Sequence, residues 1–253
     1  MKTAVITAVQ KRARRKAGNA GGARGGLVIG ACSAWLILML LTALLGPQLT
    51  PYDYSAIDLL DRLSPPGQNH HLLGTDHLGR DIFSRLIVSI RLTVLVAVLA
   101  TIIGALLGTA AGVAAAHFRG RVDDLVMVFV DFQAAIPFMI IALAVLAFAG
   151  NKMPVFIAVL GIQGWEKYAR IARGMTLSAQ KQSYVAAVRS LGLPHFRVYW
   201  RHILPNISSA LIVNLTLNFP ETILWESALS FLGLGVQPPE PAWARCWATA
   251  ATT

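Results

Sequence analysis

Apolar runs long enough to cross a bilayer alternate with polar segments along this chain. The first run, Leu27–Leu45, has 19 residues and ends at Gly46-Pro47. A helix of that length extends about 28 Å, close to the hydrocarbon thickness of a membrane. The run therefore predicts a retained span over residues 27–46. The alternative is a cleaved signal peptide, for which the run is long and lacks an obvious small-x-small cleavage site.

Four further apolar runs predict an all-α, polytopic membrane helix bundle with five spans in total. One run is too short to cross a bilayer by itself, so its helix must continue into the polar residues that follow. Pro137 predicts a kink in the run that contains it. The runs are Leu86–Ala116, Leu125–Ala149, Met153–Trp165 with its continuation to Ala172, and Ile207–Val236.

The runs divide the chain into successive parts. These are a basic tail at 1–26, the first span at 27–46, a polar loop at 47–85, a core at 86–243 that includes a polar segment at 166–206, and a different tail at 244–253.

Three glycines in the second run recur at four-residue spacing: Gly104, Gly108 and Gly112. This spacing places them on one helix face, where small residues permit a second helix to approach closely. The alternative is that glycine is simply tolerated in a membrane helix.

The composition excludes several classes of protein. Hydrophobic residues make up 55% of the 253 residues and charged residues only 13%, with a mean hydropathy of +0.59. These values argue against an ordinary soluble enzyme and a disordered chain. Two cysteines, Cys32 and Cys246, are too few for a disulfide scaffold.

The net charge of +10 predicts an orientation rather than a nucleic-acid partner. Residues 1–26, 117–124 and 166–206 together hold 16 of the 22 Lys and Arg residues. These segments share one side if five spans alternate. The positive-inside rule then places them in the cytoplasm and the acidic 47–85 loop outside.

The 166–206 segment predicts a compact cytoplasmic knob of two short helices. Lys181–Leu191 lacks Pro and Gly and is followed by Gly192 and Pro194, which end a helix. His195–Ile203 predicts a second helix that ends at Leu204-Pro205. The small side chains of the first helix would let a partner surface approach closely. The alternative is an amphipathic helix resting on lipid headgroups.

This segment resembles the EAA loop of ABC importer permeases. The match consists of Ala186-Ala187-Val188-Arg189-Ser190-Leu191-Gly192, nine residues, and then His202-Ile203-Leu204-Pro205. The spacing from Gly192 to the end of the motif agrees with that family. The chain departs from it with Ala186 at the glutamate position, Val188 at the second alanine and His202 at the isoleucine.

Three more segments resemble the C-type subunit of the dipeptide/oligopeptide/nickel branch of that family. They are LLGTDHLGRDIFSRLI (Leu72–Ile87), GWEKYARIARG (Gly164–Gly174) and ESALSFLGLGVQPPEPAW (Glu226–Trp243).

The resemblance implies the type I ABC importer transmembrane fold, for which six spans are expected. It implies a multi-pass protein of the bacterial cytoplasmic (inner) membrane with a cytoplasmic N-terminus. Its partners would be a second, B-type permease subunit, cytoplasmic ATP-binding subunits and an extracytoplasmic solute-binding protein. This chain would hold no ATP site, cofactor or metal and would not be an enzyme. The residues implied to couple to the ATPase are Ala186, Ala187, Arg189, Gly192, Leu204 and Pro205.

Acidic residues in spans are costly and usually face the bundle interior or water. Asp131 is expected to pair with a basic residue such as Arg119 or Arg121, or to line a pathway. Glu221 and Glu226 are candidates for the pathway between two permease subunits or for structural hydrogen bonding.

Other polar residues outside the spans predict simpler roles. Asp81 is expected to cap a helix that starts at Ile82. His70, His71 and His77 lack the spacing of a metal site and are expected to be solvated.

The 244–253 tail departs from the resemblance after Trp243. One G inserted after the Trp243 codon of a possible coding sequence gives Trp-Gly-Glu-Met-Leu-Gly-Asp-Gly-Arg-Asn, a family-like continuation. A frameshift that removes a sixth span is therefore one hypothesis.

The predicted function is the permease subunit of an ATP-driven importer of di- or oligopeptides. The alternatives are a nickel or other small-solute importer permease, a non-functional frameshifted fragment of such a permease, and an intramembrane enzyme. The last requires a catalytic pair in adjacent spans, which a single Asp does not provide.

Overall fold

A computed structural model describes residues 30–46, 48–68, 71–183, 185, 188, 194–235, 243 and 246. The described residues form helices and a single isolated β-bridge, between Thr75 and Asp81. The helices are Gly30–Gly46, η1 (Leu59–Asp61), α2 (Ile82–Phe118), α3 (Gly120–Ala135), α4 (Phe138–Ala149), α5 (Met153–Ile162), α6 (Trp165–Gln180), α8 (His195–Val198), the π-helical η2 (Tyr199–Ile203) and α9 (Leu204–Phe231). The predicted all-α fold is confirmed.

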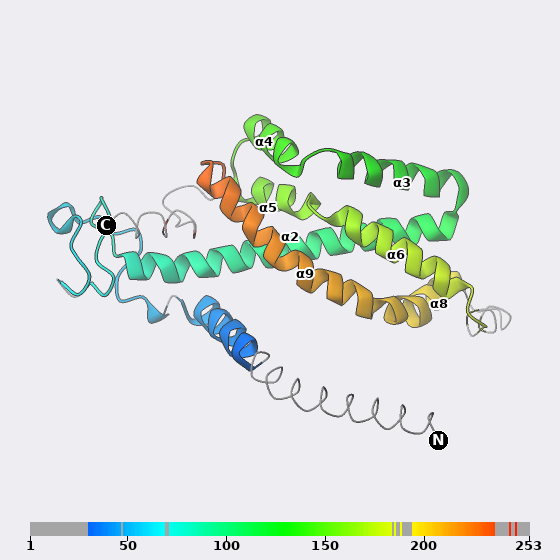
Figure 1. Cartoon of the computed structure of the whole chain (residues 1–253), viewed down its shortest axis with the longest axis horizontal. Coiled ribbons are helices and arrows are strands. Elements are labelled where there is room, and N and C mark those ends of the chain that lie inside the picture. Colours follow the sequence, from blue (N-terminus) through cyan, green and yellow to red (C-terminus); the bar gives the residue numbers. More distant parts are fainter. Residues whose placement is uncertain are drawn as a thin grey trace, which may run out of the picture.

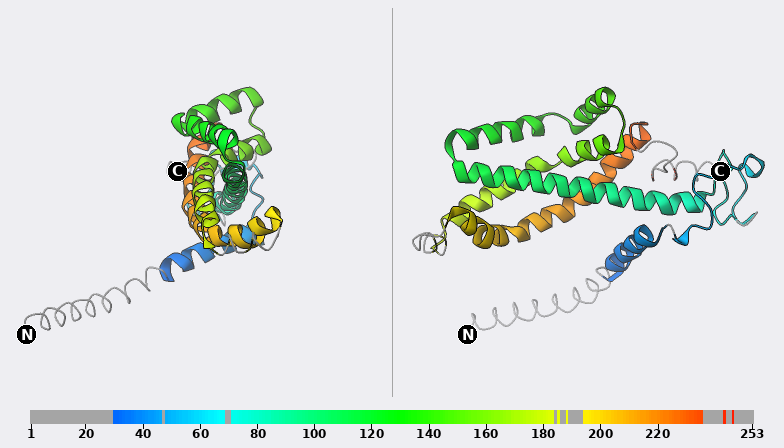
Figure 2. Two further views of the ribbon diagram at one scale, coloured as in Figure 1. Left: turned by 90° about the vertical axis from the view of Figure 1, so that its right-hand side faces the viewer. Right: turned by 180° about the vertical axis from the view of Figure 1, so that it is seen from behind.

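The bundle is built around α2, which α6 and α9 cross diagonally (Figure 1). The helices α3 and α4 lie along one edge, against α6 and α5, and Gly30–Gly46 lies at the opposite edge (Figure 2). The carboxylate of Asp81 accepts a hydrogen bond from the backbone N–H of Ser84 at 2.7 Å, so Asp81 caps α2 as predicted. A turn at Arg119 and Gly120, both with positive φ, ends α2 and starts α3.

The glycine stripe of α2 is the contact surface for α5 and α6. A Cβ at Gly104 would lie 2.8 Å from the carbonyl oxygen of Gly161. At Gly108 and Gly112 an added Cβ would meet the carbonyl oxygens of Trp165 and Ala169 even more closely. The predicted close approach is confirmed, and backbone atoms, which cannot rotate away, fill the space.

Two of the predicted runs are broken helices. The break between α3 and α4 lies at Ile136-Pro137 and bends the pair by 91°, so the kink at Pro137 is confirmed. A second break, at Gln163-Gly164, separates α5 from α6, and Gly164 has a φ of 83° that favours glycine. After this break α6 continues to Gln180 against α2, so the polar segment at 166–206 begins inside the bundle.

The length and composition of the helices support part of the predicted topology. Among the described residues two helices, Ile82–Phe118 and Tyr199–Phe231, are long and apolar enough to cross a membrane. The bent pair of α3 and α4 would make a third span, and Gly30–Gly46 and Met153–Ile162 are shorter apolar helices. The number of five spans stays a prediction.

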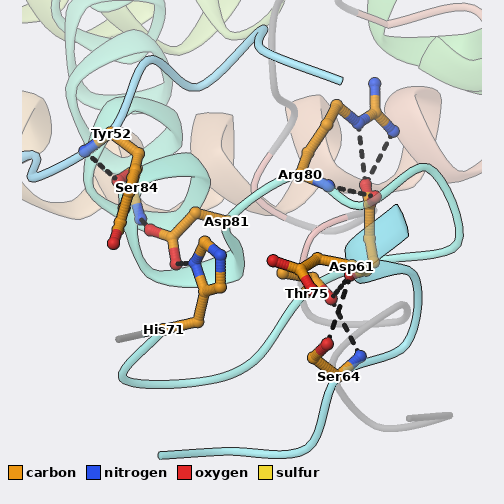
Figure 3. Close-up of polar contacts among 9 residues, drawn as sticks. Tyr52, Asp61, Ser64, His71, Thr75, Arg80, Asp81 and Ser84 are labelled. Carbon is orange, nitrogen blue, oxygen red and sulfur yellow. Dashed lines mark hydrogen bonds and ion pairs between the residues drawn. The ribbon is translucent and has the colours of Figure 1, made fainter. Parts of the chain in front are cut away.

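The 47–85 loop folds over the start of α2. The two carboxylate oxygens of Asp81 make different contacts there. Its Oδ2 caps α2, and its Oδ1 lies 2.9 Å from His71 Nδ1 (Figure 3). His71 is 8% exposed, and its ring lies 4.6 Å from that of Tyr52, measured between centroids. The expectation that His71 is solvated is therefore wrong. His77 is exposed as expected, and His70 lies outside the described residues.

A second buried aspartate organises the same loop. Asp76 accepts hydrogen bonds from the backbone N–H groups of Leu78 and Arg80 and from the Arg80 guanidinium. Burial raises the pKa of the Asp76 carboxyl, but these hydrogen bonds and the Arg80 charge together outweigh it and leave the pKa below its ordinary value. The carboxylate therefore stays ionised at neutral pH. The described residues of the 47–85 loop are held in a folded arrangement by these contacts.

Asp81→Ala is expected to destabilise the packing of the 47–85 loop against the start of α2. Loss of the helix cap and of the partner of a buried histidine should together cost about 2–4 kcal/mol. The measurement is thermal unfolding of the purified permease in detergent, with Asp53→Ala as control. Asp53 is exposed, and its carboxylate accepts hydrogen bonds from the backbone N–H and the hydroxyl of Ser55, two residues away. Equal stability of the two variants would contradict the assigned role of Asp81.

Candidate functional site

A polar pocket lies where the two helix breaks face α9. It has a volume of about 320 Å³. It is lined by Gln133, Ala134, Ile136, Pro137, Phe138, Met139, Ile141, Gln163, Gly164, Glu166, Lys167, Glu221 and Trp225. We call this the polar pocket. Irregular backbone at membrane depth is tolerated only inside protein or against a water-filled cavity, because lipid cannot satisfy its hydrogen bonds.

An ion pair between α6 and α9 is the centre of the polar pocket. Lys167 Nζ lies 2.6 Å from Glu221 Oε2, and Gln163 Nε2 donates to Glu221 Oε1 at 3.1 Å. The two charged side chains are 40% and 38% exposed. A pair this accessible contributes at most about 1 kcal/mol to stability. It can therefore open at little cost.

A second set of hydrogen bonds joins α3 to the end of α5 and to the start of α6. Trp165 Nε1 donates to Gln133 Oε1 at 2.6 Å, and Gln133 Nε2 donates to the carbonyl oxygen of Ile162 at 2.8 Å. The α3 side chain Gln133 thus holds the end of α5 and the start of α6. These bonds keep the break between α5 and α6 in one geometry.

Three buried polar atoms of pocket residues have no hydrogen-bond partner among the described residues. They are Gln163 Oε1, Glu166 Oε2 and Trp225 Nε1. Gln163 is only 5% exposed, so its orphaned oxygen cannot be attributed to a solvated surface. Buried polar groups are normally paired, and such exceptions need an explanation. These two acceptors and one donor are therefore left for a ligand that the pocket takes up when the three side chains reorient.

The two candidate glutamates occupy different places. Glu221 lines the polar pocket. Glu226 is fully buried between α9 and α2, where Thr93 Oγ1 donates to its Oε2 at 3.3 Å and Ser230 Oγ to its Oε1 at 3.0 Å. The contacts of Glu226 are structural hydrogen bonds, whereas a pathway role of Glu221 stays a prediction.

Asp131 lies outside the polar pocket. It pairs with Arg170 Nη2 at 2.9 Å, and its side chain is 71% exposed. The expected pairing with a basic residue is confirmed, but the partner is neither of the two examples, and Arg119 instead donates to Gln180 Oε1 at 2.8 Å. The reason is that α6 lies against α3 and brings Arg170 to Asp131.

The predicted coupling residues fall into two groups. Ala186, Ala187, Arg189 and Gly192 lie outside the described residues. Leu204 and Pro205 begin α9, and α8, η2 and α9 follow one another without interruption. The predicted helix end at Leu204-Pro205 is therefore wrong. Pro205 lies in the first turn of α9, where a missing N–H is tolerated, and the preceding turn is π-helical.

Sequence reasoning missed most of the polar pocket. Gln133, Gln163, Glu166, Lys167 and Trp225 were not selected, although Glu166 and Lys167 stand inside a recognised motif. The signal that could have identified them is the position of Glu166 and Lys167 in the predicted continuation of the Met153–Trp165 span, because charged residues in spans often have a function. Among the residues with described positions, no group of three His, Cys, Asp or Glu side chains could hold a metal ion.

Comparison with known proteins gives two family matches. Residues 104–249 match the family described as binding-protein-dependent transport system inner membrane component. Residues 30–66 match the N-terminal TM domain of oligopeptide transport permease C.

Individual relatives agree with these matches. The chain is 35% identical over 208 residues to the oligopeptide transport system permease protein OppC of Bacillus subtilis, which covers 82% of this chain and 68% of that protein. It is 36% identical over 234 residues to the di/tripeptide transport system permease protein DppC of Pseudomonas aeruginosa, covering 90% and 75%. It is 33% identical over 213 residues to the glutathione transport system permease protein GsiD of Pectobacterium atrosepticum, covering 84% and 71%.

The first family match covers more than half of the chain, and the relatives are aligned over most of their own length. Together with the helical fold, these matches establish that the chain belongs to the inner membrane components of binding-protein-dependent transport systems, as a permease subunit of an ABC importer.

Proposed function

We propose that this chain imports di- and oligopeptides, and that the polar pocket lines its half of the translocation pathway. The observation that carries the proposal is the accessible Lys167–Glu221 pair beside two helix breaks. Relatives named as peptide and glutathione permeases support the substrate class. A B-type permease subunit would supply the other half of the pathway.

Energy would reach the pocket through the 166–206 segment. Cytoplasmic ATP-binding subunits would dock around Ala186 and Gly192, the positions that match the EAA motif. From His195 the described helices run without interruption into α9, which carries Glu221. A displacement of the docked segment would thus be transmitted along one continuous helical path to the polar pocket.

The topology follows from the same proposal. Five spans in the bacterial cytoplasmic membrane would place the basic N-terminal tail and the coupling segment in the cytoplasm. The folded 47–85 loop would face the solute-binding protein that delivers the peptide.

The chemistry of the polar pocket favours a peptide over a nickel ion. Lys167 and the Gln163 amide both donate to the Glu221 carboxylate. The Lys167 ammonium, bonded to the Glu221 carboxylate, repels a divalent cation, whereas a zwitterionic peptide offers both donors and acceptors.

The test is uptake in a bacterial strain that lacks its own peptide importers. The strain expresses this chain with its B-type subunit, ATP-binding subunits and binding protein, and takes up a labelled dipeptide or ⁶³Ni²⁺. We expect ATP-dependent accumulation of the dipeptide only. Gly192→Arg should reduce uptake to background and prevent co-purification of the ATPase, because a bulky charge at the motif glycine blocks docking. Nickel uptake without peptide uptake, or unaltered coupling in Gly192→Arg, contradicts the proposal.

A further inference from the structure

The polar pocket holds more acceptors than its own donors satisfy. Glu221 accepts from Lys167 and Gln163, while Gln163 Oε1 and Glu166 Oε2 are buried without a partner among the described residues. An ammonium group carries three N–H donors and no acceptor. It is the group of a peptide that suits such a set of oxygens best.

The side chain of Lys167 already places an ammonium beside these oxygens. Its Nζ lies 2.6 Å from Glu221 Oε2. Because both side chains are partly exposed, at 40% and 38%, an incoming ammonium can reach Glu221 and exchange with Lys167. A transport site needs binding that is favourable enough to fill and weak enough to empty.

The wall of the pocket suits the same group. Trp225 packs against Phe138 with ring centroids 5.2 Å apart, and both side chains line the pocket. Aromatic faces attract cations, and the attraction is strongest for tryptophan.

Resting on the proposed function, we propose that the polar pocket binds the N-terminal ammonium of a peptide in transit. Glu221, Glu166 and Gln163 are the acceptors. Lys167 occupies the Glu221 carboxylate in the empty state and yields it to the substrate. Lys167 and Glu221 therefore have opposite effects on the substrate, although they form one ion pair.

The experiment uses proteoliposomes that contain the whole importer, including its ATP-binding subunits and binding protein. It measures the uptake of Ala-Ala and of N-acetyl-Ala-Ala, at saturating binding protein, and takes the ratio of the two rates. Any preference of the binding protein for the free amine is the same in every sample, so it cancels when the ratios of the variants are compared. The amount of each variant in the liposomes is quantified to exclude differences in folding.

Glu221→Gln is expected to lower the Ala-Ala to N-acetyl-Ala-Ala ratio about tenfold, since one charge-assisted hydrogen bond to the ammonium is lost. Lys167→Gln is expected to raise the ratio, because the competing ammonium is gone. A pair with a merely structural role would make the two variants alike.

The matched control is the exposed Asp131–Arg170 pair, which joins α3 to α6 and lies outside the pocket. Asp131→Asn and Arg170→Gln should leave the ratio unchanged. Equal loss of both substrates in Glu221→Gln, or a lowered ratio in Lys167→Gln, overturns the ammonium site while peptide import by the wild type stands. A wild-type importer that moves no peptide overturns the proposed function and the ammonium site with it.

Discussion

Gly108→Leu is expected to prevent stable accumulation of the permease in the membrane. An added Cβ at this position would overlap the carbonyl oxygen of Trp165 and approach the Cβ of Tyr168 at 2.7 Å. Overpacking by a few methylene groups costs about 1–3 kcal/mol where side chains can adjust. Here backbone atoms fill the space, so α2 and α6 would have to separate. We expect a loss of at least about 3 kcal/mol, a large part of the stability of a typical domain.

The control for this variant is Gly174→Leu. Gly174 lies on α6, the helix that packs against Gly108, but no atom lies within 4 Å of the Cβ that would be added there. The same change of residue type should therefore leave the protein level unchanged. The measurement is the amount of permease in membranes by immunoblot, followed by thermal unfolding in detergent. Normal accumulation of Gly108→Leu would show that the glycine stripe is not needed for helix packing.

Glu226→Ala is expected to destabilise the packing of α9 against α2 by about 2–4 kcal/mol. The truncation leaves a cavity and removes the acceptor for two buried hydroxyl groups, those of Thr93 and Ser230. Glu226→Gln should retain most of the stability, because an amide oxygen still accepts a hydrogen bond and the side chain keeps its volume.

Thermal unfolding and uptake together distinguish the two roles considered for Glu226. A structural role predicts that Glu226→Ala lowers the unfolding temperature and that Glu226→Gln behaves like the wild type in both measurements. If instead Glu226→Ala were fully stable and Glu226→Gln transported no peptide, Glu226 would belong to the pathway and its burial would need another explanation.

Several features of the fold were predictable because they depend on local sequence. The length of each apolar run determines whether a helix can reach across a bilayer. Asp81 caps α2 and Pro137 ends α3 through interactions with their immediate neighbours. The helical period alone places Gly104, Gly108 and Gly112 on one face of their helix, although it does not predict which helices contact that face.

The errors concern residues whose partners lie far along the chain. His71 was expected in solvent because a polar loop was expected to be open, whereas the loop folds back onto Asp81 and Tyr52. The expected pairing of Asp131 with a basic residue is confirmed, but the partner is Arg170, 39 residues away, rather than Arg119 or Arg121. The helix end expected at Leu204-Pro205 rested on proline alone, and a proline in the first turn of a helix does not end it.

The sequence by itself determined that this is a helical membrane protein, the family to which it belongs and the glycine face of its longest helix. Only the tertiary structure decided that Glu221 meets Lys167, 54 residues away, while Glu226, five residues further along the same helix, is sealed against α2. Hydrophobic periodicity is a local property that each segment carries. Which neighbouring helix a polar side chain contacts depends on the rotation of both helices about their axes and on their crossing angle. The packing of the whole bundle sets both.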